Sequence, residues 1–307
     1  MSFNVTPKWA ADKNYLWHSN PENVPNCKTF FEKCVVRPKT NSAWKVLKKE
    51  TDGNLEQARA IIAKYAYDNA NMLGGRTVQT MCDMVLIDGA DQEEAIRHGA
   101  SEFDSYKPCH FKLEKDTNQT AVVRDEYVSV FKSAIDGIKE AADYFGLNRL
   151  EGEKELMFNV PGLQLPYNGR PDFSKRIELK TKWSSYSDKT KSGKRSASLP
   201  TQPLFSHVAQ VAGYWAGTAR MPQAIVYANA TGSRVFTPDN CDWLTQQSME
   251  TVAQRLFAKC KIRENLLKKS ADVDELLSLI EPDFAHLYAW DVAPSVLLEA
   301  KQIWGMA

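Results

Sequence analysis

A change of hydrophobic period at Gly146 constrains the fold more than any other feature of the sequence. Before this glycine, apolar residues recur every three or four positions, as in amphipathic helices, at about residues 55–66, 76–88, 92–105 and 122–145. After it come short segments rich in β-forming residues, at about 155–160, 163–167, 169–174 and 176–181, with a hairpin signal at Asn168-Gly169. The chain therefore combines helices with a small sheet, and all-helical and all-β folds are excluded.

The remaining segments extend this α/β pattern. Residues 204–219 are predicted to be a helix, 224–228 a buried strand, 234–236 a short strand paired with it, and 240–268, 272–280 and 293–305 helices. We expect the strands of 155–181 to form an antiparallel sheet and the polar residues 182–203 to be a mobile loop. Three regions follow: a mostly helical region at 1–150, a core at 151–237, and C-terminal helices at 238–307 packing on that core.

Composition narrows the class of protein. The 307 residues are 43% hydrophobic and 25% charged, which is ordinary for a globular domain. The net charge is +1, so any attraction for a polyanion has to come from a local patch. No apolar stretch approaches the roughly 20 residues that a bilayer span needs, and the N-terminus lacks a secretory pattern. We expect no membrane association and a cytoplasmic location, which is the host cytoplasm if the source is viral.

The segment from Gly169 to Thr181 carries the chemistry. Glu178 and Lys180 alternate with apolar residues along a strand and so share one face. If two residues connect this strand to the preceding one, Asp172 faces away from Glu178; if three residues do, Asp172 lies opposite Glu178 on the same face. Two adjacent carboxylates repel unless a divalent cation lies between them, and such oxygen ligands favour Mg²⁺ or Mn²⁺.

Pro171-Asp172 followed by Glu178-Leu179-Lys180 resembles the signature of the PD-(D/E)XK nuclease superfamily, whose members cut nucleic-acid phosphodiesters with Mg²⁺ or Mn²⁺. The RecB-like branch carries a Gly-Arg-x-Asp strand, an acidic-x-Lys-Thr strand and a Gln-xxx-Tyr helix. This chain has the three in that order: Gly169-Arg170-Pro171-Asp172, Glu178-Leu179-Lys180-Thr181 and Gln210 to Tyr214. The resemblance implies a restriction-endonuclease-like core, a small mixed β-sheet flanked by helices, within a helix-rich chain.

The resemblance also implies a role for each matched residue. Asp172, Glu178 and the backbone carbonyl of Leu179 would hold the cation. Lys180 would orient the attacking water or offset the charge that develops. Gln210 and Tyr214 would position the substrate strand. Taken in isolation, their helix fits a purely structural role about as well, with Gln210 capping a backbone group and Tyr214 in the core.

Two further features of the family can be compared with this sequence, and one of them matches better than the other. The branch has an acidic residue on a helix ahead of the Asp strand, and Glu153 is the best match, with Glu155 next. Many members also carry a Gly-xxx-His whose His completes the metal site. The corresponding residues here are Gly75 and Gln79, so a glutamine stands where the histidine is usual.

A basic segment adjoins the predicted site. Residues 170–195 hold nine basic side chains against three acidic ones. Each neutralised phosphate makes binding salt-sensitive, and aromatic rings in the segment can stack on unpaired bases for roughly 1–3 kcal/mol each. The alternative is an ordinary solvated loop. The predicted DNA-binding residues are Arg170, Lys182, Trp183, Tyr186, Lys189, Lys191, Lys194 and Arg195.

These features predict a metal-dependent deoxyribonuclease. We favour an exonuclease that acts at free or single-stranded DNA ends, in recombination, repair or phage-type DNA metabolism, with a recombination or replication protein as a possible partner. The phage-type, standalone form fits a chain without the phosphate-binding loop of an NTPase motor. Two alternatives stay open: a site-specific or structure-specific endonuclease, and an inactive nucleic-acid-binding protein on a nuclease scaffold.

Overall fold

The computed structural model describes the central part of the chain and a few short pieces outside it. These are residues 6–11, 16–19, 69–107 and 113–270, with the single positions 275, 279, 284, 298 and 301. The helix predicted at 55–66 lies outside the described residues, and the helices predicted at 272–280 and 293–305 do so except at single positions. The chain divides into two compact units: a first unit of residues 1–67, 157–168 and 254–307, and a second unit of residues 68–156 and 169–253. This division differs from the three consecutive regions expected from the sequence.

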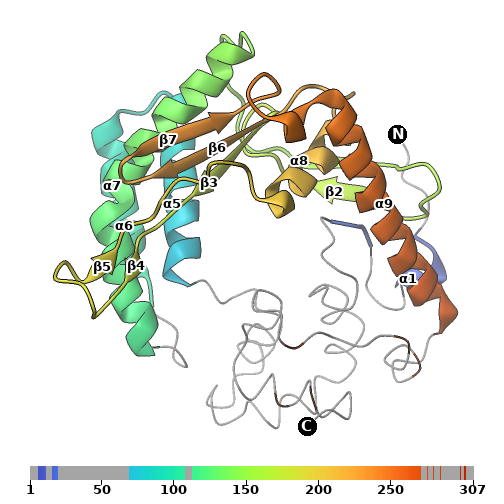
Figure 1. Cartoon of the computed structure of the whole chain (residues 1–307), viewed down its shortest axis with the longest axis horizontal. Helices are drawn as coiled ribbons and strands as arrows, with labels where there is room; N and C mark the ends of the chain where they lie inside the picture. The colour runs from blue at the N-terminus through green and yellow to red at the C-terminus, as the bar shows by residue number, and fades with distance from the viewer. Residues whose placement is uncertain are drawn as a thin grey trace. The chain divides into compact units, whose positions relative to one another are not determined.

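Three helices open the second unit (Figure 1). They are α5 (Ala70–Leu86), α6 (Gln92–Ser105) and α7 (Leu113–Tyr144). The sequence predicted a helix at about 76–88, but α5 begins at Ala70 and runs through Gly74 and Gly75. A Cβ atom on Gly74 would lie 2.5 Å from Cγ1 of Val123 and 2.7 Å from Cζ2 of Trp183. Gly74 therefore serves close packing inside the helix, and the predicted start near residue 76 was too late in the chain.

The second unit contains a mixed three-stranded sheet, so the fold is mixed α/β. Strand β3 (Ile177–Thr181) runs parallel to β6 (Ala224–Asn229), and β6 is antiparallel to β7 (Gly232–Phe236). Helix α8 (Phe205–Gly217) lies in the crossover between β3 and β6, as parallel strands require. The expected antiparallel sheet over 155–181 is present in part: Phe173 and Ile177 form an antiparallel bridge, but the partner strand of β3 is β6. Strands β1 (Leu156–Phe158) and β2 (Tyr167–Gly169) form a separate pair.

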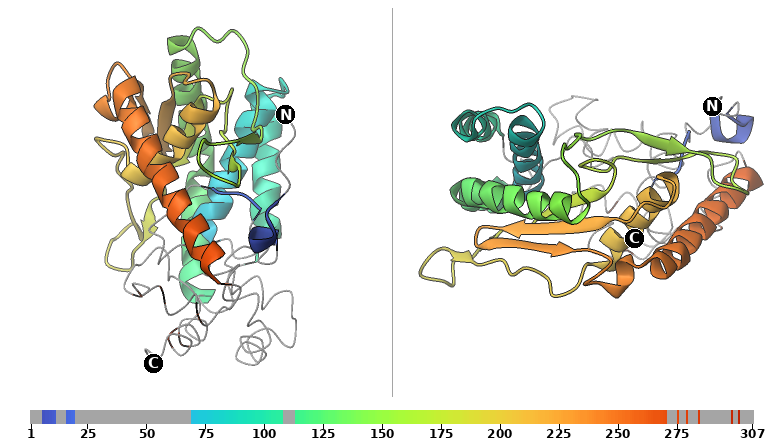
Figure 2. Two further views of the ribbon diagram at one scale, coloured as in Figure 1. Left: turned by 90° about the vertical axis from the view of Figure 1, so that its right-hand side faces the viewer. Right: turned by 90° about the horizontal axis from the view of Figure 1, so that it is seen from above.

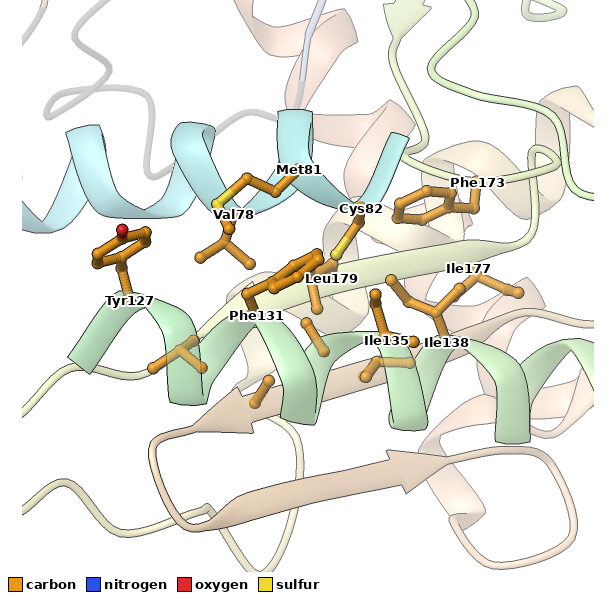
Figure 3. Close-up of a cluster of buried hydrophobic side chains, with 14 of the residues drawn as sticks. Val78, Met81, Cys82, Tyr127, Phe131, Ile135, Ile138, Phe173, Ile177 and Leu179 are labelled. Atoms are coloured by element: carbon orange, nitrogen blue, oxygen red, sulfur yellow. The ribbon is translucent and has the colours of Figure 1, made fainter. Parts of the chain in front are cut away.

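The core of the second unit fixes which way β3 presents its side chains. Figure 2 shows α7 running alongside β6 and β7. In Figure 3, Ile177 and Leu179 of β3 meet side chains of α5 and α7, among them Phe131 and Ile138. Because successive side chains of a strand point to opposite faces, this packing directs Glu178 and Lys180 away from α5 and α7. The predicted catalytic pair is thus positioned by the apolar residues beside it.

The predicted mobile loop contains a hairpin. Strands β4 (Ser185–Tyr186) and β5 (Lys194–Arg195) pair antiparallel, and α7 holds the hairpin at its base. Oε2 of Glu126 accepts the backbone N–H of Ser184 at 3.0 Å, while Gln119 donates to the Ser184 carbonyl at 2.7 Å and accepts the N–H of Tyr186 at 2.8 Å. The sequence pattern missed these anchors because they come from a helix about 60 residues away in the chain.

The first unit is organised around the C-terminal part of α9 (Gln246–Lys269). The ring of Phe257 packs edge to face on Phe158 and on Tyr167. The carboxylate of Glu264, fully buried, accepts the backbone N–H of Gln164 at 2.7 Å. Short helix α1 (Lys8–Ala11) belongs to this unit, whereas the 3₁₀ helix η4 (Asp242–Leu244) belongs to the second. No helix among the described residues is long and apolar enough to cross a membrane.

Candidate active site

A three-residue connection brings Asp172 to Glu178. Phe173 and Ile177 exchange two backbone hydrogen bonds, each 3.0 Å, across Ser174, Lys175 and Arg176. Ser174 and Lys175 have φ of 49° and 60°, in the left-handed region that non-glycine residues seldom adopt. Of the two registers that the sequence allowed, the structure has the one that places Asp172 opposite Glu178.

The side chain of Asp172 is hydrogen-bonded to the edge of β3 opposite to the one that pairs with β6. Its Oδ2 accepts the backbone N–H of Leu179 at 2.7 Å. Ile177 directs both its N–H and its carbonyl to this edge, toward Phe173, and Leu179, two residues on, repeats that orientation. The Leu179 carbonyl therefore lies on the same edge as Asp172, where the predicted metal-ligand role needs it.

A hydrogen-bond network joins the three predicted motifs. The ammonium of Lys180 donates to Oε1 of Glu178 at 2.5 Å and to Oε1 of Gln210 at 2.9 Å. Nε2 of Gln210 donates to Oε1 of Glu178 at 2.6 Å and to the hydroxyl of Tyr214 at 2.7 Å. That hydroxyl donates in turn to the carbonyl of Arg170 at 3.2 Å. The segment ahead of β3 that carries Arg170 and Asp172, strand β3 and helix α8 thus meet at one place.

Burial and like charge perturb both carboxyl groups. Burial, followed by the charge of Glu178, raises the pKa of Asp172 well above its ordinary value. Burial also raises the pKa of Glu178, against the opposing effect of Lys180. For Lys180, burial lowers the pKa, but the charges of Glu178 and Asp172 outweigh it and the pKa is raised. Lys180 is therefore an ammonium at neutral pH.

One buried oxygen of the site lacks a partner among the described residues. Oε2 of Glu178 makes no hydrogen bond, although the side chain is only 3% exposed. A divalent cation between Asp172 and Glu178 would satisfy this oxygen and offset the repulsion of the two carboxylates, so the residues fit Mg²⁺ or Mn²⁺. Within the described part of the chain, no group of three His, Cys, Asp or Glu side chains is arranged to hold a metal. Backbone oxygen and water would complete the ligand set.

Comparison of the chain with family models, curated proteins and solved structures found no match.

Glu153 lies near the site, in a different local structure from the one expected. Residues 151–155 form no helix; they have no regular secondary structure and precede β1. The carboxylate of Glu153 lies 3.6 Å from a guanidinium nitrogen of Arg170. Its charge is among the lesser causes that raise the pKa of Asp172 and of Glu178. Glu153 thus acts on the site electrostatically.

The sequence interpretation missed Asp83 on α5. Gln79, which stands where the family has histidine, donates to Oδ1 of Asp83 at 3.3 Å. Burial raises the pKa of Asp83 to about 6 against the opposing effect of the hydrogen bond from Gln79, and the charges of Asp88 and Glu153 contribute smaller increases. Asp83 follows Gln79 by four residues, so the two share a helix face. That four-residue spacing was the available signal, but the family pattern specifies only position 79 and so did not indicate Asp83.

Two predicted DNA-binding residues, Trp183 and Lys194, make contacts within the protein instead. Trp183 is 8% exposed; its ring packs on Gly74 and its N–H donates to Oγ1 of Thr181 at 3.1 Å. This burial contradicts the predicted stacking of Trp183 on a base. The ammonium of Lys194 lies 2.7 Å from Asp125 and 3.2 Å from Glu126. Lys194 therefore secures the hairpin to α7, and its charge is largely neutralised.

The other predicted DNA-binding residues are accessible to differing extents. Tyr186 is 43% exposed on β4. Lys182 is half-buried, and its ammonium lies 5.7 Å from the centre of the Tyr227 ring. The exposed basic side chains are Arg170, Lys189, Lys191 and Arg195. Lys189 and Lys191 lie between β4 and β5, so the hairpin presents cationic groups to solvent.

Proposed function

We propose that the chain is a metal-dependent deoxyribonuclease with a restriction-endonuclease-like core, of the PD-(D/E)XK type. The observation that carries this proposal is the meeting of Asp172, Glu178 and Lys180 at a three-residue turn, with a buried oxygen of Glu178 left without a partner. A structural ion pair between Glu178 and Lys180 would need neither the second carboxylate nor the unpaired oxygen. Buried, mutually repelling carboxylates beside an ammonium are typical of sites that bind a cation and an anionic substrate.

Each side chain has a task in phosphodiester hydrolysis. Asp172, Glu178 and the carbonyl of Leu179 would hold Mg²⁺ or Mn²⁺, which when bound polarises a phosphate and lowers the pKa of a water. Lys180, fixed by Glu178 and Gln210, presents a positive charge where the phosphate gains negative charge, and such preorganised charge is usually a large catalytic contribution. Tyr214 fixes the orientation of Gln210 by accepting one of its N–H groups.

The order of the three motifs favours an exonuclease acting at free or single-stranded DNA ends, in recombination, repair or phage-type DNA metabolism. This part of the proposal rests on the resemblance to RecB-like nucleases. An inactive scaffold would have been favoured if Asp172 and Glu178 faced opposite sides of the sheet. Their position across the turn from each other supports the proposal of an enzyme instead.

A cleavage assay tests the proposal. The full chain is incubated with end-labelled linear DNA and with circular DNA, each single- and double-stranded, in Mg²⁺, Mn²⁺ or EDTA. We expect loss of linear DNA with either metal and none in EDTA, while circles survive; cutting of circles would indicate an endonuclease. Lys180→Ala should abolish cleavage. Asp188→Asn, an exposed acid of the hairpin, is the matched control and should cut normally. Full activity of Lys180→Ala would contradict the proposal.

A further inference from the structure

An exposed pair of aromatic rings lies at the start of α8. Phe205 is 48% exposed and Trp243, on η4, is 41% exposed, although the two rings contact each other edge to face at a centroid distance of 5.7 Å. Leu204, next to Phe205, is 45% exposed. Large apolar side chains clustered on a surface are typical of binding sites, and none of the chemistry described above uses these rings.

Helix α8 and strand β6 tie this aromatic pair to the candidate active site. Lys180 lies beside Tyr227 in the sheet. The Tyr227 hydroxyl accepts the backbone N–H of Leu204 at 3.1 Å and lies 2.6 Å from Nδ1 of His207. His207 precedes Gln210 by three residues, so one helix carries the aromatic Phe205 at its start and the Gln210 of the active site about 1.4 turns later. Phe205 and the catalytic residues therefore belong to one rigid frame.

Three cationic side chains lie around Tyr227, namely Lys180, Lys182 and Arg234, against one acidic side chain, Glu178, which is paired with Lys180. This excess of positive charge indicates the charge of the occupant. Lys180, Tyr227 and Arg234 are cross-strand neighbours and so share one face of the sheet. The ammonium of Lys182 lies 5.7 Å from the Tyr227 ring centre. Burial and the charges of Lys180 and Lys182 lower the pKa of His207 to about 4, which leaves its imidazole neutral. An anionic backbone is attracted here, whereas the cores of protein–protein interfaces are depleted in charge.

We propose that Phe205 and Trp243 form a stacking platform for an unpaired nucleobase of the DNA strand whose phosphate lies at Asp172 and Glu178. This inference rests on the proposed function and specifies its substrate as a single-stranded or frayed end, because bases inside a duplex have both faces covered. Lys182 and Arg234 would neutralise backbone phosphates near the site. The platform would hold the strand in register while Lys180 faces the scissile phosphate.

Binding of a labelled single-stranded oligothymidine of about 12 nucleotides, a length within known site sizes, tests the platform. Fluorescence anisotropy is measured in EDTA with the full chain. Phe205→Ala and Trp243→Ala should each raise Kd about 5- to 150-fold, the range expected for one lost stacking contact. Trp243→Phe keeps a ring and should retain most of the affinity. Ile262→Ala removes a 50% exposed apolar side chain of the first unit and should bind like the wild type.

An abasic oligonucleotide of equal length separates base stacking from other contacts. The wild type should bind it as weakly as the alanine variants bind the intact strand, and those variants should lose little more on it. Equal losses by the variants on both strands would overturn the platform. The platform would also be overturned if the wild type cut DNA and both variants had a Kd for the intact strand within about twofold of the wild-type value. An apolar protein segment would then be the better occupant of the aromatic pair, and the nuclease proposal would survive. A wild type that neither binds nor cuts DNA would remove both proposals.

Discussion

The carboxylate of Asp172 is held by the backbone N–H of Leu179, the residue that lies between Glu178 and Lys180, at 2.7 Å. Leu179 itself is anchored by its side chain in the core formed with α5 and α7. The packing of one apolar residue therefore sets the distance between the two carboxylates. The same arrangement buries two neighbouring carboxyl groups, so their ionisation costs free energy. We therefore expect the carboxylates that would bind the metal to lower the free energy of unfolding.

Asp172→Asn should stabilise the second unit at alkaline pH. The folded-state pKa of Asp172 is raised, chiefly by burial, so the ionised carboxylate favours the unfolded state above that pKa. Asparagine keeps an oxygen for the Leu179 N–H without the charge, and the free energy of unfolding should rise by about 1 kcal/mol or more at pH 8. Urea unfolding measures it.

The gain in the free energy of unfolding from Asp172→Asn should depend on pH. As the pH falls through the raised folded-state pKa and then below the ordinary value of 3.8, the wild-type carboxyl becomes neutral in both states, so the gain from Asp172→Asn should disappear. The exposed Asp188→Asn should show no such pH-dependent gain. A gain independent of pH would mean that charge is not its cause.

The parts of this site that the sequence could predict are those set by local periodicity. Alternation along β3 put Glu178 and Lys180 on one face, and the four-residue spacing on α8 put Gln210 and Tyr214 together. The register of Asp172 stayed open because Ser174 and Lys175 adopt left-handed conformations without being glycine. Local propensity does not predict such a turn.

Other features depend on contacts between distant segments. Nothing in β3 itself reveals that its neighbour is β6, since pairing depends on the crossover through α8. Trp183 looked like an exposed ring in a polar loop, but the space made by Gly74 on α5 accommodates it in the core. Burial of this kind is a property of the assembled fold and cannot be read from the basic segment that surrounds Trp183.

Added Mg²⁺ or Mn²⁺ should stabilise the wild type and not Glu178→Gln. The unpaired oxygen of Glu178 is buried, and a ligand that binds only the folded state raises stability by about 2.7 kcal/mol at 100 times its Kd. Thermal unfolding at constant ionic strength, with NaCl replacing the divalent salt, measures the shift in Tm. Equal shifts in both proteins would place the cation elsewhere.

Tyr214→Phe should impair catalysis less than Gln210→Ala. Removing the hydroxyl frees one N–H of Gln210 but leaves its contacts with Glu178 and Lys180. The loss of one hydrogen bond is worth about 1 kcal/mol, so kcat should fall about fivefold, whereas Gln210→Ala should lower it further. Single-turnover cleavage rates compare the two. Equal rates for Tyr214→Phe and the wild type would limit Tyr214 to a packing role.

Glu264→Gln should destabilise the first unit at neutral pH. Burial raises the pKa of Glu264, but hydrogen bonds from His18, Leu165 and Gln164 outweigh it and lower the pKa to about 2. A depressed pKa contributes stability that is present above the ordinary value of 4.5 and is lost as the pH falls toward 2. The variant should therefore lose stability at pH 7 and approach the wild type near pH 3. Limited proteolysis at the two pH values measures the difference.

The salt dependence of DNA binding should distinguish the two exposed lysines of the hairpin from Lys194, which forms ion pairs. Lys189 and Lys191 are exposed between β4 and β5, whereas Lys194 is paired with Asp125 and Glu126. Each phosphate contact contributes about 0.7 to the slope of log K against log salt for a single strand. Replacing both Lys189 and Lys191 with alanine should therefore reduce the slope by about 1 to 1.5. Lys194→Ala should leave the slope nearly unchanged while loosening the hairpin, which hydrogen exchange at Ser184 and Tyr186 would report. A larger change in slope for Lys194→Ala than for the double variant would show that DNA displaces the two carboxylates and binds Lys194 instead.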